Sequence, residues 1–411
     1  MTPFPLPLTD IFGPVGVYFV YIAIGFAFGM VLEMSGFANS TKLAAQFYLK
    51  DHTVLKVMFG AIVVAMILIF AATGFGLLDY NKVWVNPTYL VPGIVGGLVM
   101  GFGFIIGGFC PGTSLVAAAT GKIDGVLFVL GAFFGMFLFG ETVGLYDTFW
   151  HSTDMGRFTL PEFLNLDTGV VVVLIAVMAL VVFFGVEQLE RILNKGAAGS
   201  PTRPKWRIGA AGVTLIGAFA VMFIGQPTTA DRWSWIEPEK EQLITDRAVQ
   251  VHPGEYLSIR DNHRLNLITI DVRDQRDYNL FHLRDAQHIP LDELEAAIPD
   301  LMLEPSNTVF MLVSNDETQA TEAWRMLQAN SVPNVYLLEG GVNQWLALFG
   351  TLDAAIRPSS VTGDDQLRFA FGGAHGERSA AAAPHTEEFP LEFTTKVQLQ
   401  SRGGGAAGGC G

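Results

Sequence analysis

The stretch GGFCPGTS, residues 107–114, lies inside a long apolar segment and interrupts it with residues that do not suit a continuous helix. Pro111 has no backbone N–H to donate, and it disfavours helical geometry at Cys110, the residue before it. Three glycines that tolerate unusual backbone angles surround this pair: Gly107, Gly108 and Gly112. The stretch therefore predicts a break between two half-helices within a bilayer span.

Thr113 and Ser114 follow the break and would begin the second half-helix. Freed backbone groups inside hydrocarbon must be satisfied by protein or by a water-lined cavity. The start of a helix also presents N–H groups that favour an anion. We therefore interpret residues 107–114 as part of a substrate pathway. The alternative is a packed helix kink in which Cys110 is a small buried hydrophobe.

The chain around this stretch divides into an apolar half, residues 1–226, and a more charged half, residues 227–411. A hydrophobic content of 50% with 16% charged residues suits a membrane domain fused to a soluble one. The first apolar segment has no basic residue before it and no small-residue cleavage site after it, so we expect a retained span. Because about 20 apolar residues cross a bilayer, the sequence predicts six membrane helices near 15–36, 55–78, 90–109, 124–145, 169–189 and 207–226.

Basic residues gather in alternate connections between these helices, and such connections usually lie in the cytoplasm. Three of them precede or begin the second helix, one follows the third helix, and five more lie between the fifth and sixth. The first four are Lys42, Lys50, Lys56 and Lys122. Six crossings would then place both termini and the soluble half in the periplasm of a bacterial inner membrane. One re-entrant segment counted as a span would reverse this orientation.

Composition also excludes several classes of function. A net charge of −14 offers no basic face to nucleic acid. The two cysteines are too far apart in sequence to suggest a disulfide framework or a structural zinc site. The eight histidines are scattered, so we expect no metal site and no cofactor.

The apolar half contains an internal repeat. GFAFGMVLEMSGFANST, residues 25–41, aligns with GLVMGFGFIIGGFCPGT, residues 97–113, at a constant spacing of 72. Five identities share this spacing: Gly25 with Gly97, Gly29 with Gly101, Gly36 with Gly108, Phe37 with Phe109 and Thr41 with Thr113. Duplicated membrane domains often form a substrate site where broken helices of the two halves meet.

Two carboxyl groups, Glu33 and Glu141, fall within the expected membrane helices. Ionisable groups there are costly and often functional. The alternative is that each lies near a helix end, where water or a hydrogen bond satisfies it.

The repeat, the short connection at 42–54 and above all GGFCPGTS resemble the YeeE/YedE family of sulfur-compound transporters over most of residues 15–190. This resemblance implies import of thiosulfate or a related sulfane-sulfur anion, with Cys110 contacting the ion on a central path. The first repeat of the family usually carries a second cysteine, but here the matching position is Ala38. Polar residues at that level could still supply hydrogen bonds: Asn39, Ser40 and Thr41.

In the charged half, strands alternate with helices, which favours an open, mainly parallel sheet with helices on both faces. The phrases IDVRD, HLRDAQHIPL and VYLLEGGVNQW resemble a rhodanese domain over about residues 240–355. The family pattern Cys-x-x-Gly-x-Arg-Ser is absent, because Ser314 stands where the catalytic cysteine would be and acidic residues follow it. A hydroxyl cannot form a persulfide, so we expect this loop to have no sulfurtransferase activity. Asp271 and Arg273 would brace the loop region.

The chain ends in SRGGGAAGGCG, which places the second cysteine, Cys410, near the end of a glycine-rich string. Glycine-rich strings behave as flexible coils. The terminal GGCG also resembles the swinging arm of the sulfur carrier SoxY. This resemblance implies that Cys410 is a mobile sulfur carrier, with a periplasmic sulfur-carrier protein as a candidate partner. The alternatives are an incidental cysteine or an intermolecular disulfide.

The sequence thus predicts a multi-domain chain: an α-helical polytopic membrane domain with an internal repeat, an α/β rhodanese-like domain, and a flexible Gly-rich tail. The leading function is transport rather than catalysis. A membrane-anchored sulfurtransferase that uses Cys410, or a sulfur-sensing or docking protein, remains an alternative. The expected segments are a transporter domain at 1–226 with repeats at about 25–80 and 97–147, a linker at 227–239, a rhodanese-like domain at 240–357, and an extension at 358–411.

Overall fold

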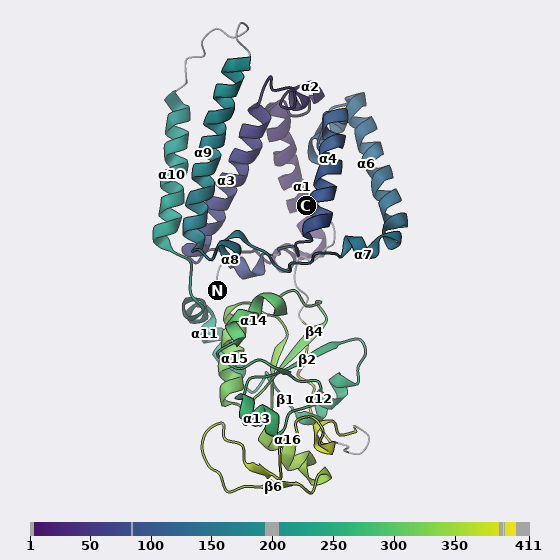
Figure 1. Ribbon diagram of the computed structural model, residues 1–411, viewed down its shortest axis with the longest axis vertical. Helices are drawn as coiled ribbons and strands as arrows, with labels where there is room; N and C mark the ends of the chain where they lie inside the picture. Colours follow the sequence, from purple (N-terminus) through teal and green to yellow (C-terminus); the bar gives the residue numbers. More distant parts are fainter. Residues whose placement is uncertain (1–3, 84, 194–204, 386–388, 390, 400–411) are drawn as a thin grey trace. The chain divides into compact units, whose positions relative to one another are not determined.

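A computed structural model describes residues 4–83, 85–193, 205–385, 389 and 391–399 (Figure 1). The chain forms two compact units. The first, called here the membrane unit, comprises Thr2–Tyr80 and Val85–Gln226. The second, the α/β unit, contains Pro227–Gly411 together with Met1 and Asn81–Trp84. Cys410 and the glycine string lie outside the described residues.

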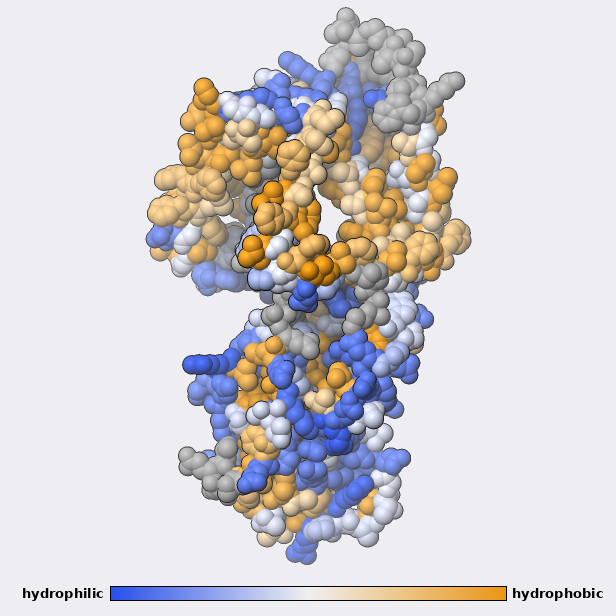
Figure 2. Space-filling view, turned by 180° about the vertical axis from the view of Figure 1, so that it is seen from behind, coloured by the Kyte–Doolittle hydropathy of each residue, from blue (hydrophilic) through white to orange (hydrophobic). Residues whose placement is uncertain are grey.

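In the parts of the membrane unit that the structure describes, six helical segments are long and apolar enough to cross a bilayer, as the sequence predicts. Figure 2 shows their hydrophobic side chains on the molecular surface, where a bilayer would solvate them. One segment, Leu90–Ala119, consists of two helices with a break between them, α4 (Leu90–Gly107) and α5 (Pro111–Ala119). The other long helices are α1 (Leu8–Met34), α3 (Thr53–Gly74), α6 (Ile123–Thr142), α9 (Thr168–Leu193) and α10 (Lys205–Ile224).

Short helices lie in the connections of this unit: α2 (Ser40–Ala44), α7 (Asp147–Trp150) and α8 (Leu160–Leu164). Among the long helices, α3, α9 and α10 form a packed group around small buried side chains that include Ala176 and Ala218. A Cβ on Gly169 of α9 would lie only 2.6 Å from the Cα of Met222 in α10. Small residues allow this close approach, which is how helices associate without a hydrophobic driving force between them.

The α/β unit is built on a five-stranded parallel sheet with strand order β1-β5-β4-β2-β3. The central strand, β4 (Thr308–Val313), is buried at all six residues and pairs with β2 (Asn266–Asp271) from Asn266↔Thr308 to Asp271↔Val313. The other strands of this sheet are β1 (Gln250–Val251), β3 (Gln287–His288) and β5 (Val335–Leu338). The helices of the unit are α11 (Thr229–Thr245), α12 (Pro253–Arg260), α13 (Gln275–Leu280), α14 (Leu294–Leu301), α15 (Thr318–Ala329) and α16 (Gly341–Phe349).

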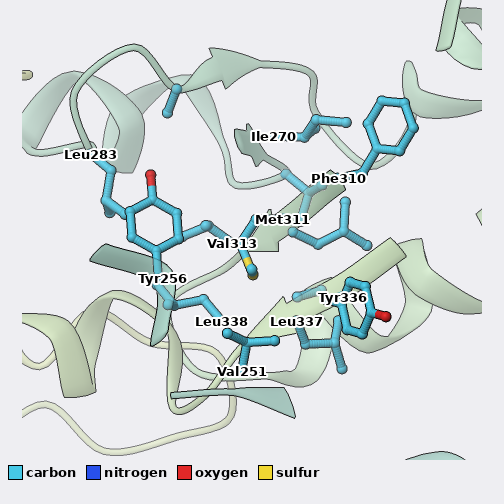
Figure 3. Packing of buried hydrophobic residues seen from close by; sticks show 14 of the residues in the cluster. Val251, Tyr256, Ile270, Leu283, Phe310, Met311, Val313, Tyr336, Leu337 and Leu338 are labelled. Carbon is cyan, nitrogen blue, oxygen red and sulfur yellow. The ribbon is translucent and has the colours of Figure 1, made fainter. Parts of the chain in front are cut away.

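Aliphatic side chains of the strands form the core of this unit, and Figure 3 shows them beside the ring of Tyr256 from α12. The Tyr256 hydroxyl lies 2.8 Å from Oγ1 of Thr269, so the buried phenol keeps a hydrogen-bond partner. Trp345 is fully buried and donates its indole N–H to the carbonyl of Ala381 at 2.7 Å. This bond attaches the chain beyond α16 to the core.

Residues 227–239, which the sequence assigns to a linker, lie mostly within α11 in the structure. Thr228 and Asp231 form a capping box that starts this helix. The rings of Trp233 and Trp324 meet edge to face at 6.3 Å between centroids, and Arg325 pairs with Glu241. Helix α11 therefore packs on α15 as part of the α/β unit.

The extension after residue 357 also packs on this unit. It contributes β6 (Ile356–Pro358), which starts just before it, and β7 (Phe369–Phe371), an antiparallel pair. Further on, the backbone N–H groups of Lys396 and Val397 both donate to Oε1 of Glu255, at 2.8 and 2.9 Å. The Tyr336 hydroxyl donates to the carbonyl of Gln398 at 2.9 Å. Residues 391–399 are therefore anchored, although none of them is assigned to a strand.

A buried ion pair braces the loop that follows β4. Arg273 is 1% exposed and donates from Nε to Oδ1 of Asp271 at 2.8 Å. Its other nitrogens donate to Oδ1 of Asn315 and to the carbonyl of Phe281. Asp271 and Arg273 thus hold the loop after β4 against α13.

We predict that Asp271→Asn lowers the free energy of unfolding by about 3 kcal/mol, because the Arg273 guanidinium would be buried without its counter-charge. Thermal unfolding of the purified full chain measures this change. The matched control is Asp274→Asn, which makes the same charge change at an exposed residue and should shift stability by less than about 0.5 kcal/mol. Equal effects of the two substitutions would contradict the bracing role.

Candidate functional site

The break predicted from GGFCPGTS is present between α4 and α5. Helix α4 ends at Gly107, and Gly108 follows it in the left-handed region with φ of +71°. Cys110 is extended and serves as the N-cap of α5, whose first residue is Pro111. The second half-helix therefore starts slightly earlier than expected, because proline is well suited to the first position of a helix.

Cys110 is half-buried at this break. Its backbone N–H donates to Oγ1 of Thr113 at 3.1 Å, and its Sγ lies 3.2 Å from the same oxygen. The first backbone N–H groups of a helix have no partner within the helix and carry a partial positive charge. The thiol thus lies at the end of α5 that favours an anion.

Thr113 and Ser114 lie within the first turn of α5, and both are nearly completely buried. The Thr113 hydroxyl is directed to Cys110, and the Ser114 hydroxyl donates to the carbonyl of Pro111 at 2.8 Å. Both side chains therefore satisfy the backbone of the break. Their position indicates that they shape the Cys110 turn.

The first repeat has a similar break. Helix α1 ends at Met34, and Gly36 has a φ of +71°, the same value as its partner in the alignment, Gly108. The aligned phenylalanines are buried alike, with Phe37 1% and Phe109 0% exposed. At these two aligned pairs, the backbone angle and the burial in the structure agree with the spacing of 72 in the sequence.

Polar residues of the first break each have a protein partner. Asn39 is the N-cap of α2, and its side-chain oxygen accepts from the backbone N–H and the hydroxyl of Thr41 at 3.1 and 2.8 Å. Ser40 donates to Oδ2 of Asp124 at 2.9 Å. Ala38, at the position that matches Cys110, is 1% exposed.

The two breaks adjoin one another. A Cβ on Gly108 would lie 3.0 Å from both the Cβ and the carbonyl oxygen of Ser40. Phe37, Ala38 and Phe109 belong to one buried cluster. The structure therefore brings residues 36–41 and 107–114 together at one junction, which we call the break junction.

Two lysines also take part in the break junction, although the sequence analysis used them only for orientation. Nζ of Lys42 donates to the carbonyl of Ser35 at 2.6 Å and lies 5.7 Å from the centre of the Phe37 ring. Nζ of Lys122 donates to the carbonyl of Ala38 at 2.9 Å. In the sequence, a lysine follows the polar residues of each break, and this pattern could have identified both residues.

Glu33 and Glu141 are both exposed and lie in the last turns of α1 and α6. This placement is the helix-end alternative that the sequence left open. Neither carboxyl group belongs to the break junction.

The loop after β4 in the α/β unit was the second candidate site. Ser314, at the position of the expected nucleophile, is completely buried. Asp365 of the extension occupies this loop: the backbone N–H of Asp316 donates to its Oδ1 at 2.9 Å, and its own N–H donates to Oδ2 of Asp316 at 2.7 Å. Part of the extension thus packs against the loop that would carry the nucleophile.

The two carboxyl groups in this loop have opposite pKa shifts. Burial, together with the neighbouring Asp316 carboxylate, raises the pKa of Asp365 to about 6. Burial acts to raise the pKa of Asp316 as well, but hydrogen bonds from Thr318 and Asp365 lower it to about 2. The loop therefore favours one ionised and one protonated carboxyl group below pH 6.

The parts of the chain that the structure describes contain no group of three His, Cys, Asp or Glu side chains that could hold a metal ion. The break junction instead offers a thiol, helix N–H groups and two ammonium groups. This set of groups can bind an anion and contact a polarisable sulfur atom.

We predict that Asp365→Asn makes the α/β unit more stable at pH 8, by about 2 kcal/mol. Folding raises the pKa of Asp365. The stability that the protonated carboxyl group contributes to the folded unit is therefore fully present below about pH 4 and is lost as the pH rises through about 6. The amide oxygen of the Asp365→Asn variant can still accept from the backbone N–H of Asp316. Because the amide does not ionise, this variant does not lose stability as the pH rises. Thermal unfolding of the full chain at pH 4 to 8 measures the change, with the exposed neighbour substitution Asp364→Asn as the control. A pH dependence that is unchanged in Asp365→Asn would contradict the assignment.

Both units of the chain match known protein families. The family model described as sulphur transport matches residues 35–246, and the model of the rhodanese-like domain matches residues 253–348. The thiosulfate transporter TsuA of Spirochaeta thermophila is 26% identical over 140 residues, which cover 34% of this chain and 40% of that protein. The matched region thus spans less than half of this relative's length. Since the sulphur-transport model covers more than half of the chain, the protein belongs to the sulphur-transport family and carries a rhodanese-like domain after its membrane unit.

Proposed function

We propose that this protein imports thiosulfate or a related sulfane-sulfur anion across the bacterial inner membrane. The observation that carries the proposal is the break junction, where Cys110 at the start of α5 adjoins the break of the first repeat. Membership of a sulphur-transport family and the name of the relative TsuA support the same substrate class.

In this proposal the substrate makes two kinds of contact at the junction. Its negative charge interacts with the N–H groups at the start of α5, because helix starts favour anions. Its terminal sulfur contacts the Cys110 thiol, a weak S–H donor and a polarisable acceptor. The substrate pathway would include residues 107–108 and 111–114 of the second repeat and Asn39, Ser40 and Thr41 of the first. No covalent step is required for passage.

We predict that Cys110→Ala lowers the initial rate of thiosulfate uptake about tenfold to a hundredfold, because a hydrogen bond to a charged group contributes about 1.5–3 kcal/mol. Uptake of labelled thiosulfate into proteoliposomes measures the effect. Cys110→Ser retains a donor and should be less impaired.

The matched control is Thr120→Ala, which removes an exposed hydroxyl at the other end of α5 and should leave uptake unchanged. Normal uptake by Cys110→Ala would exclude Cys110 from the pathway.

We also propose that Cys410 lies in the periplasm and captures or delivers sulfur there, with a periplasmic carrier protein as its partner. The anchoring of residues 391–399 places the start of the final segment on the α/β unit, so Cys410 would share the compartment of that unit. The distribution of basic connections in the sequence supports the periplasmic side.

A single-thiol variant tests the compartment, because Cys110→Ala leaves Cys410 as the one remaining cysteine of the chain. We expect a membrane-impermeant maleimide to label this variant in intact spheroplasts as fully as in lysed ones. Labelling that appears only after lysis would place the C-terminus in the cytoplasm. The double variant Cys110→Ala/Cys410→Ala is the control for background labelling.

A membrane-anchored sulfurtransferase is the alternative proposal. It would require Cys410 as the nucleophile, because Ser314 is buried and Asp365 fills its loop. Turnover of thiosulfate and cyanide by the purified full chain, abolished by Cys410→Ala, would favour this alternative.

A further inference from the structure

The two lysines of the break junction carry charges that their hydrogen bonds to backbone carbonyls do not neutralise. Lys42 and Lys122 are both half-buried beside a cluster of apolar side chains. Within the described residues, neither ammonium group has a carboxylate at ion-pair distance. A partly buried charge without a counter-ion is costly. Such a charge next to a membrane pathway usually has a functional role.

Hydrogen bonding leaves donor capacity on both groups. An ammonium group has three N–H donors. Lys42 uses one for the carbonyl of Ser35, and Lys122 uses one for the carbonyl of Ala38. Each can therefore hold the backbone of the first break and still donate to another acceptor. This further acceptor would have to be negatively charged to compensate the charges of the two lysines.

The acidic groups nearby do not take this role. Asp124, at the start of α6, accepts from Ser40 and from the backbone N–H of Gly125. Asp51, in the connection after α2, accepts from the backbone N–H of Thr53 and acts on Lys42 only through space. The two ammonium groups of the break junction thus donate to backbone carbonyls and not to these carboxylates.

A chain of contacts relates the lysines to Cys110. The carbonyl that Lys122 contacts belongs to Ala38, and Ala38 packs in the same buried cluster as Phe109, the residue before the thiol. Ser40, two residues after Ala38, is in contact with Gly108. Lys42 comes from the first repeat and Lys122 from the second, and both donate to carbonyls of the first break, Ser35 and Ala38.

We infer that Lys42 and Lys122 form the oxyanion-binding element of the transport site and determine its preference for a sulfur anion that carries charged oxygens. The inference rests on the proposed function and deepens it: Cys110 contacts the sulfur end, and the two lysines contact the oxygens. A divalent oxyanion with a terminal sulfur fits both sets of groups. A neutral sulfur compound, or hydrosulfide without oxygens, would leave the ammonium groups uncompensated.

Binding of thiosulfate to the purified full chain tests this inference without any need for flux. We expect thiosulfate to raise the melting temperature of the wild type, and Lys122→Gln to raise the apparent Kd at least tenfold. Lys122→Arg should restore the Kd to within about threefold. The melting temperature without ligand should stay the same in Lys122→Gln, because the amide can still donate to the Ala38 carbonyl.

Lys50→Gln is the matched control, since it removes the same charge from an exposed residue in the connection between α2 and α3. It should change the Kd less than twofold. If Lys122→Gln does not fold, Lys42→Gln tests the second ammonium group with the same expected loss. Unchanged affinity in the lysine variants, or no thiosulfate binding by the wild type, would overturn the inference. Binding with this lysine dependence but without uptake into proteoliposomes would refute transport and leave the oxyanion element in place.

Discussion

The membrane unit depends on one constraint: backbone groups that leave a helix inside an apolar environment must find partners. Two such breaks meet at the break junction, and side chains satisfy backbone groups at both. At the first, Asn39 caps α2 while Lys42 and Lys122 donate to freed carbonyls. At the second, the Thr113 and Ser114 hydroxyls serve the turn around Cys110. The polar groups of the junction therefore satisfy the backbone of the fold itself, and the same groups are the ones that we propose bind the anion.

The sequence predicts the architecture well because the relevant signals are local. Apolar length fixes the six helical spans, and alternating strands and helices fix the parallel sheet. The break at Cys110 follows from Pro111 and its glycines, whose backbone preferences act within a few residues. The linker expected at 227–239 is mostly helix because the capping box at Thr228 and contacts with α15 outweigh its polar composition.

The candidate site is less accessible to sequence reasoning because it depends on contacts between distant residues. Lys122 and Ala38 are 84 positions apart, and no local pattern reveals their hydrogen bond. Asp365 reaches the loop after β4 from a segment 49 positions away. The sequence does show that the nucleophile of this loop is absent. It cannot show that the carboxyl group of Asp365 packs in this loop beside Asp316.

The anchoring of residues 391–399 limits the space available to the second thiol. Ten residues lie between Leu399 and Cys410, so covalent geometry keeps the Cα of Cys410 within about 40 Å of the Cα of Leu399. Confinement of this kind corresponds to an effective concentration on the order of millimolar. Any sulfur donor that docks on the α/β unit would meet this thiol in an intramolecular encounter, whose rate is set by the length of the tether and is independent of the abundance of the protein in the cell.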